Sequence, residues 1–404
     1  MALSQKPGFR WLVLGVATIA QATACFLVQG LGALSSNLQA SLELNAFEIG
    51  LLVSAAQIVP VLGLLVAGEL LDRFNERQII GIGTLLVAVS LWMASLATSY
   101  GNLLVWLTVT GLGYSTAQPG GSKSVSGWFS KSQRGFAMGI RQAGLPLGGS
   151  IAAASLPLIA TNYGWQAAFQ VGAGVALAGA VLFVLVYRSP TESSVSSPPP
   201  QTNAPSTLRE RLALLRLPQM RNIIWSGVSL IAAQYGIVIF LALYLHERFR
   251  ISIETSVMML FLAQGAGVVG RIVLARWSDS SQQGRFFPVL VSIVAVLLGL
   301  ILLLIPLTNS VIGLAVLSIW LGFFGFGWYG PWVTYVSESA PPLREGFTLG
   351  LAMAINQVVV VGSPPLLGWL RDATGSYTAS WLLLIVMLLA SLLMVTRQHF
   401  RSRR

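Results

Sequence analysis

Twelve stretches of about 20 residues in this chain are almost wholly apolar. An α-helix needs about 20 such residues to cross the apolar part of a bilayer. Hydrophobic residues make up 55% of the chain and charged residues 9%, which is more apolar side chain than a soluble domain of 404 residues can bury. The sequence therefore predicts an all-α membrane protein with twelve transmembrane helices. Their approximate positions are 11–34, 49–70, 78–98, 101–123, 135–160, 165–187, 220–245, 255–277, 286–307, 310–335, 345–370 and 378–396.

One polar segment, residues 188–218, divides these apolar stretches into two sets of six. Its first half is rich in Ser and Pro, a composition typical of a linker that packs no core of its own. We therefore expect an N-terminal six-helix bundle at 1–187, a cytoplasmic linker at 188–218 and a C-terminal six-helix bundle at 219–404.

The two halves also share short sequence matches that occur in the same order. Such matches at equivalent spans indicate two pseudo-symmetric repeats, an organisation typical of secondary transporters. The matches are RGFAMG at 134–139 with EGFTLG at 345–350, GLGY at 111–114 with GFGW at 325–328, and GELLDRFNER at 68–77 with ARWSDSSQQGR at 275–285.

The distribution of Lys and Arg predicts the orientation of the chain. Eighteen of them fall on the side that holds both termini, and three, Arg248, Arg250 and Arg371, fall on the other. Because cytoplasmic segments carry the excess of positive charge, both termini are expected in the cytoplasm, at a bacterial inner membrane. The basic residues are scattered and form no basic face, so the net charge of +11 does not indicate a nucleic-acid partner. Cys25 is the only cysteine, which excludes an internal disulfide.

The loop after the second span carries a recognisable pattern, namely Gly68, Asp72, Arg73 and Arg77. With it the chain resembles the major facilitator superfamily over nearly its whole length, although Asn75 and Glu76 replace a glycine and a basic residue of the family pattern. The resemblance implies two six-helix bundles and an inner latch that includes Asp72. Asp279 stands at the end of the eighth span, in the position that matches this loop of the first half. A partial antiporter-like pattern in the fifth span favours a kinked, closely packed helix; it comprises Gly144, Pro146, Gly148 and Gly149.

Two arginines, Arg141 and Arg271, lie deep inside predicted spans, whereas Lys123 is near enough to the inner end to extend toward it. At 1.5 Å per residue both arginines sit roughly 10–12 Å from the inner end of their helices. No Asp or Glu occupies the middle of any predicted span, so an anionic substrate would supply the missing counter-charge. Alternatively, each arginine bonds backbone carbonyls or amides and holds helices together.

The eighth span, with Arg271 followed by Ser278 and Asp279, is similar to the oxalate–formate antiporter and monocarboxylate transporter branch. The resemblance implies that Arg271 binds a substrate carboxylate. The chain departs from this branch at two places, one that concerns proton coupling and one that concerns a second positive charge. Gly267 stands where monocarboxylate transporters carry an Asp, and the eleventh span offers Asn356 and Gln357 where the antiporter uses a lysine.

Amide and aromatic side chains within the spans complete the predicted substrate site, since hydrogen-bonding groups between aromatic walls suit a small organic anion. We expect about half of them to line the cavity beside Arg271 and Arg141. The candidates are Gln21, Tyr114, Gln118, Gln142, Gln234, Tyr235, Gln264, Trp328, Tyr329, Trp332, Asn356 and Gln357.

These observations predict a monomeric secondary transporter in a lipid bilayer that moves a mono- or dicarboxylate by alternating access. It would work as an exchanger or as a symporter with a proton or cation. The alternatives are a transporter of an inorganic anion such as nitrate or cyanate, and a drug-efflux antiporter, which would need a carboxylate within the membrane. A receptor or scaffold would need a soluble module, and the longest polar segment has 31 residues. No metal, cofactor or nucleophile pattern indicates an enzyme.

Overall fold

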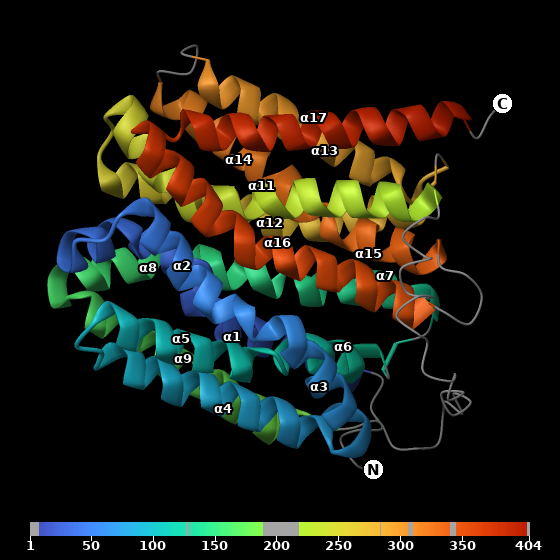
Figure 1. Ribbon diagram of the computed structural model, residues 1–404. Coiled ribbons are helices and arrows are strands. Elements are labelled where there is room, and N and C mark those ends of the chain that lie inside the picture. The colour runs from blue at the N-terminus through green and yellow to red at the C-terminus, as the bar shows by residue number, and fades with distance from the viewer. Residues whose placement is uncertain are drawn as a thin grey trace.

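The computed structural model describes residues 8–126, 128–129, 131–188, 218–282, 284–305, 310–339 and 345–401, and within them every regular element is a helix (Figure 1). The first nine are α1 (Phe9–Leu42), α2 (Ala46–Ile58), α3 (Pro60–Arg73), α4 (Glu76–Ser95), α5 (Tyr100–Tyr114), α6 (Ala117–Ser126), α7 (Lys131–Gln142), α8 (Gly144–Tyr163) and α9 (Trp165–Val186). The others are α11 (Pro218–Phe249), α12 (Ile253–Ser280), α13 (Phe287–Leu304), α14 (Val311–Gly327), α15 (Tyr329–Glu338), α16 (Glu345–Thr374) and α17 (Thr378–Arg401).

Each of the twelve predicted spans corresponds to one of these helices or to two consecutive ones. Among the described residues, eleven segments are long and apolar enough to cross a membrane. The predicted span at 101–123, which comprises α5 and α6, is not among them. The prediction of an all-α fold with two six-helix bundles is confirmed.

Four of the spans are broken, and each break lies beside or just before a proline. Proline lacks a backbone N–H and clashes with the carbonyl four residues earlier, so the helix opens there. The prolines are Pro60 between α2 and α3, Pro119 after the α5–α6 break, Pro146 after the α7–α8 break and Pro331 after the α14–α15 break. The sequence thus places helix interruptions within the spans, where transporters build their sites.

The N-terminal and C-terminal halves meet along a few helix pairs. α2 packs along α16, α8 packs along α12, and α1 contacts α11. Figure 1 shows the first half in blue and green beside the second half in yellow to red. The boundaries 1–187, 188–218 and 219–404 stay a prediction, since residues 189–217 lie outside the described part of the chain.

Close helix packing at the kinked fifth span depends on glycine. A Cβ on Gly144 would lie 2.6 Å from the carbonyl oxygen of Thr18, and one on Gly148 would lie 2.4 Å from that of Ala22. The backbone of α8 therefore rests directly on α1, as expected of a kinked and closely packed helix.

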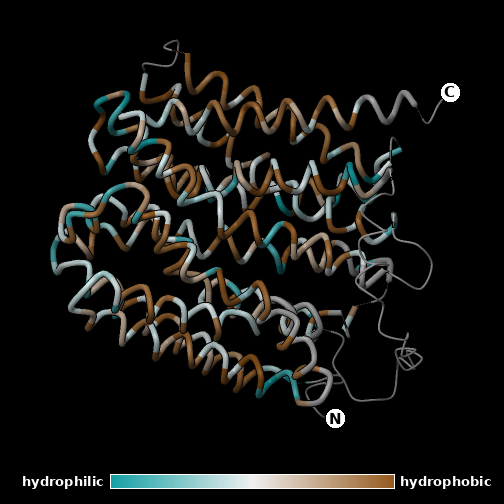
Figure 2. Tube along the Cα trace, viewed as in Figure 1, coloured by the Kyte–Doolittle hydropathy of each residue, from teal (hydrophilic) through white to brown (hydrophobic). Residues whose placement is uncertain are grey.

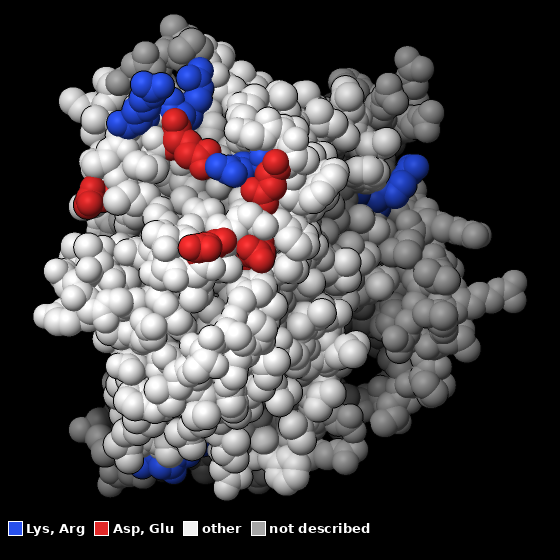
Figure 3. Space-filling model, turned by 60° about the vertical axis from the view of Figure 1, so that its left-hand side comes forward, with Lys and Arg blue, Asp and Glu red and all other residues white. Residues whose placement is uncertain are grey.

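The outer surface of the bundle is apolar along its length. Leu62, Leu158 and Ile312 are 70%, 62% and 77% exposed, which suits side chains that face lipid. Figure 2 shows the brown apolar colour along the middle of the helices, and Figure 3 shows charged side chains in a few small groups on a mostly uncharged face. Both chain ends lie on one side of the bundle (Figure 1), while their cytoplasmic location stays a prediction.

Candidate functional site

Arg271 lies in the interior of α12 and is almost completely buried, with 3% of its surface exposed. Glycines on the same helix bring α12 against α14: a Cβ on Gly270 would lie 2.2 Å from the carbonyl oxygen of Phe323. The guanidinium carbon of Arg271 lies 5.2 Å from the ring centroid of Tyr329. Its Nε and Nη1 have no hydrogen-bond partner, so two donors of a buried cation are left for another group.

Arg141 stands in the last turn of α7, directly before the break at Ala143, and is fully buried. Its Nη2 donates to the side-chain oxygen of Gln21 on α1 and to the carbonyl oxygen of Ala117 at the start of α6, each at 2.9 Å. A Cβ on Gly121 would lie 2.5 Å from its Nε, so the guanidinium group lies directly against this glycine of α6.

The two arginines belong to one polar cluster. Tyr114 and Tyr329 each lie near both guanidinium groups. The helices that carry the two arginines are also in contact, since a Cβ on Gly139 of α7 would lie 3.5 Å from the carbonyl oxygen of Arg271. The amide nitrogen of Gln21 donates to the hydroxyl oxygen of Tyr114 at 3.3 Å. Tyr114, Arg141 and Tyr329 all stand at helix ends beside proline-associated breaks, so three interrupted spans deliver their side chains to one place.

Aromatic side chains form the wall beside Arg271. Tyr329 stacks on Trp332 with ring centroids 5.9 Å apart, and Trp328 packs against both rings. The indole nitrogen of Trp328 donates to the side-chain oxygen of Gln234 at 3.2 Å, and that of Trp332 donates to the carbonyl oxygen of Ile223 at 3.0 Å. These bonds fix the rings against α11.

Several predicted amide residues lie close to this cluster with unused hydrogen-bonding atoms. Both amide atoms of Gln264, two turns before Arg271 on α12, are buried without a partner, and its side chain packs on Gly149. Both amide atoms of Asn356 are also buried without a hydrogen-bond partner, and this side chain lies next to Gly227, as does the ring of Trp332. The side-chain oxygen of Gln142 is likewise buried without a partner.

Other predicted residues are used differently. Gln357 donates to the carbonyl and side-chain oxygens of Gln57, at 3.0 and 3.1 Å, where α16 crosses α2. Tyr235 on α11 lies beside Gln29 on α1, where the two halves are in contact. Gln29 escaped the sequence prediction, although it stands eight residues after Gln21 and so on the same face of the first span. The side chain of Gln118 lies outside the described part.

Of the predicted latch residues, the structure describes the side chains of Arg77 and Asp279. Nε of Arg77 donates to the carbonyl oxygen of Val184 on α9. Asp279 pairs with Arg285, whose Nε donates to Glu338 at 2.9 Å and so connects the ends of α12 and α15. Partial burial opposes the charge of Arg285, but the two carboxylates outweigh it and raise its pKa. The side chains of Gly68, Asp72 and Arg73 lie outside the described part.

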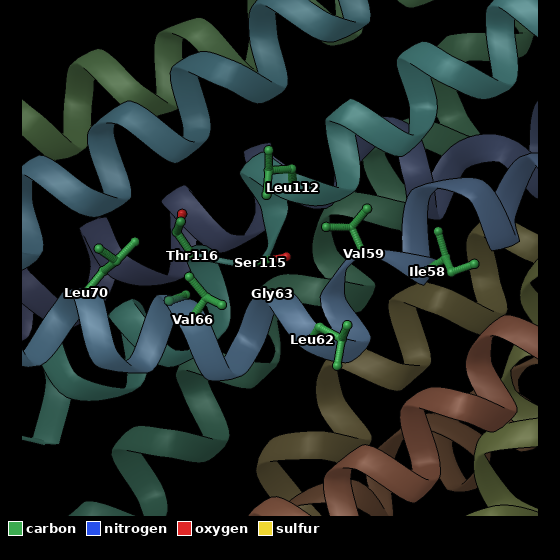
Figure 4. A pocket seen from close by; sticks show the side chains of 10 residues that line it. Ile58, Val59, Leu62, Gly63, Val66, Leu70, Leu112, Ser115 and Thr116 are labelled. Atoms are coloured by element: carbon green, nitrogen blue, oxygen red, sulfur yellow. The ribbon is translucent and has the colours of Figure 1, made fainter.

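Three grooves on the molecule, of about 400, 620 and 460 Å³, include neither arginine among their lining residues. The first lies beside the breaks in the second and fourth spans, where Leu62, Val66 and Leu112 surround an apolar hollow (Figure 4). Its chemistry suits lipid chains, whereas the polar cluster is shut inside the bundle. Among the described residues no group of three or more His, Cys, Asp or Glu side chains is arranged to hold a metal ion.

Comparison with known proteins places this arrangement in a family. The model of the Major Facilitator Superfamily matches residues 14–364. An uncharacterised MFS-type transporter of Mycobacterium tuberculosis is 27% identical over 96% of this chain and 85% of its own length. A hexuronate transporter of Bacillus subtilis is 25% identical over 86% of this chain and 84% of its own length. Monocarboxylate transporter 13 of Rattus norvegicus is 26% identical over 98% of this chain and 90% of its own length.

Solved structures agree on the fold. A bacterial homologue of the human lysosomal transporter Spinster, in an inward-facing and occupied conformation, has a TM-score of 0.72 at 15% identity, with 98% of this chain and 97% of that chain covered. The nucleoside transporter NupG has a TM-score of 0.73 at 15% identity, with 96% and 99% covered.

Proposed function

Because the chain belongs to the major facilitator superfamily, we propose that it carries a small organic anion across the membrane and that Arg271 binds the substrate carboxylate. The protein is a transporter by family, and its relatives include proteins named for hexuronate and for monocarboxylates. Both names denote carboxylates, which supports a carboxylate as the substrate class of this chain.

The observation that carries the proposal is the state of the Arg271 side chain. An unpaired buried cation is costly, and no carboxylate of the described residues pairs with this one. Tyr329 covers the guanidinium group through its ring, while Nε and Nη1 have no acceptor. A carboxylate that approaches in the plane of the guanidinium group accepts two parallel hydrogen bonds and neutralises the charge.

Arg141 assists by adding a second positive charge to the same cluster. Its bonds to Gln21 and Ala117 hold it at a fixed place, so it contributes chiefly through its field. Gln264, Asn356 and Gln142 supply the unused donors and acceptors that would bond the rest of the substrate. Alternating access between the halves would then expose this cluster to one side of the membrane at a time.

The test is a thermal-shift titration of the purified protein with five probes, namely lactate, oxalate, glucuronate, nitrate and a cationic dye. A ligand that binds only the folded state raises the unfolding temperature with its concentration. We expect stabilisation by at least one carboxylate in wild type and in the control variant Arg276→Lys, which alters an exposed arginine of the same helix, but not in Arg271→Lys. Stabilisation by nitrate alone would favour an inorganic anion, and stabilisation only by a cationic dye would overturn the proposal.

A further inference from the structure

The end of α16 is attached to the beginning of α2 on the side of the bundle opposite to the two chain termini. The carboxylate of Asp372 accepts hydrogen bonds from the backbone N–H groups of Ala46, at 3.2 Å, and Phe47, at 2.8 Å. These are the first two residues of α2, whose N–H groups have no partner within the helix. A carboxylate there also interacts favourably with the helix dipole, so Asp372 joins the two halves of the protein.

Gly368, one turn before Asp372, makes this approach possible. A Cβ at Gly368 would lie 2.2 Å from the carbonyl oxygen of Ala46, too close for any side chain. Asp372 is held in turn by Arg371, whose guanidinium group lies 3.3 Å from it and 2.9 Å from Glu247 on α11. A glycine for contact and an aspartate four residues later for capping thus form one docking unit, which we call the outer latch (Gly368 and Asp372).

The two helices that carry this latch run antiparallel. The hydroxyl of Ser54 donates to the carbonyl oxygen of Val361 at 2.5 Å, and further along Gln57 accepts from Gln357. α2 and α16 lie side by side in Figure 1, and α3 makes far fewer contacts with α16 than α2 does. The pair is therefore closed at the end that holds the outer latch.

The sequences of the two spans repeat each other with a constant offset of 300 residues (357 − 57 = 300). The same residue type stands 300 positions after Phe47, Gly50, Gln57, Gly68 and Asp72. Gln57 also contacts its own counterpart, Gln357, so the antiparallel repeats meet across a local two-fold axis at this glutamine pair. By the same offset, Asp72 and Phe347 are the sequence counterparts of Asp372 and Phe47.

We propose that Gly368 and Asp372 form a gate latch at the face opposite to the termini, the two-fold counterpart of Gly68 and Asp72 at the other face. One repeat in two orientations then provides both gates of the transporter. Closing one face docks Asp372 on the start of α2, and closing the other docks Asp72 on the start of α16. This inference rests on the alternating access of the proposed function but is independent of the substrate, and its experiment uses none.

The experiment measures spin-label distances across each face of the protein in nanodiscs, in a Cys25→Ala background. Gly101→Cys and Val311→Cys label the face of the outer latch, and Gln78→Cys and Ser280→Cys label the face of the termini; all four positions are exposed. Each pair has one label in either half of the chain. The test variants are Asp372→Ala and Asp72→Ala. Glu247→Gln is the matched control, because it alters the carboxylate that holds Arg371 and leaves the start of α2 untouched.

We expect Asp372→Ala to raise the ratio of open to closed molecules at the face of the outer latch by about three- to tenfold. Asp72→Ala should raise that ratio at the face of the termini by a similar factor, and the double variant should return both distributions toward wild type. Gly368→Ala, whose added Cβ prevents the close approach, should act as Asp372→Ala does. If it does not fold, the Asp372→Ala comparison decides alone.

An Asp372→Ala variant with a lower unfolding temperature but unchanged distances at both faces would overturn the proposal, because the aspartate would then only cap a helix. Equal shifts in Glu247→Gln and Asp372→Ala would overturn it as well, since the effect would come from surface charge. If Asp372→Ala and Asp72→Ala both raised the ratio of open to closed molecules at the same face, the two-fold relation would be refuted. A failed substrate screen with opposite shifts would instead count only against the proposed carboxylate binding.

Discussion

Arg141 and Arg271 are two buried arginines in one cluster, one from each half of the chain, and they are held in different ways. Arg141 donates to the Gln21 side chain and the Ala117 carbonyl and fits against Gly121. Arg271 rests on the ring of Tyr329 and keeps Nε and Nη1 without an acceptor. The two guanidinium groups therefore have different supports: hydrogen bonds from Nη2 hold Arg141 to α1 and α6, whereas an aromatic ring covers Arg271.

The largest expected effect comes from changing the arginine with unused donors. Arg271→Lys keeps the charge but loses the planar pair of donors, so carboxylate affinity should fall by about 2–3 kcal/mol, roughly 30- to 150-fold in Kd. The measurement is isothermal titration with the carboxylate found by thermal shift, and Arg276→Lys is the control. Unchanged affinity in a folded Arg271→Lys protein would remove the distinction between the two arginines.

A second prediction concerns the empty cluster. Two permanent positive charges without a bound anion make the return of the empty transporter through a closed state unfavourable. Efflux of labelled substrate from proteoliposomes should be faster by about tenfold when unlabelled substrate is present outside. Equal efflux into substrate-free buffer, at every pH tested, would show that another group neutralises Arg271 during the return step.

The third prediction tests the anchored arginine through its partner. Gln21→Leu removes an acceptor of Arg141 and a donor to Tyr114 within the buried cluster, which should lower stability by about 1–3 kcal/mol. Carboxylate affinity should change by less than about threefold, since Arg141 keeps its bond to Ala117. The readouts are the thermal unfolding midpoint and the Kd. A large loss of affinity with normal stability would make Gln21 and Arg141 ligand-binding residues of the same kind as Arg271.

The smallest effect is expected at the aromatic support of Arg271. Tyr329→Leu removes the ring beneath the guanidinium group and should weaken binding by about 1 kcal/mol, roughly fivefold, whereas Tyr329→Phe keeps the ring and should stay near wild type. Tyr335→Leu on the same helix is the control, because that ring packs on Phe286 and not on the arginine. Equal losses in Tyr329→Leu and Tyr335→Leu would show a general packing effect of α15.

The site was accessible to sequence reasoning only in part. A buried arginine without a carboxylate in any predicted span is visible in the sequence, and so are the amides and aromatics around it. Their partners are not. The Gln21–Arg141 bond joins residues 120 positions apart, and the Gln57–Gln357 bond joins residues 300 positions apart. No local pattern specifies such pairs. The sequence therefore offers Gln357 only as one candidate for the cavity, whereas in the structure it bonds Gln57 at the contact of α2 and α16.

The sequence by itself determined the helical spans of this protein, because the length and apolarity of a span are properties of about 20 consecutive residues. It also predicted the depth of Arg141 and Arg271, since helix rise converts position into distance. The tertiary structure alone decided which arginine is hydrogen-bonded to α1 and α6 and which one lies against an aromatic ring. That outcome depends on the side chains that neighbouring helices bring to each guanidinium group, and Gly270 sets how closely α14 approaches α12 beside Arg271.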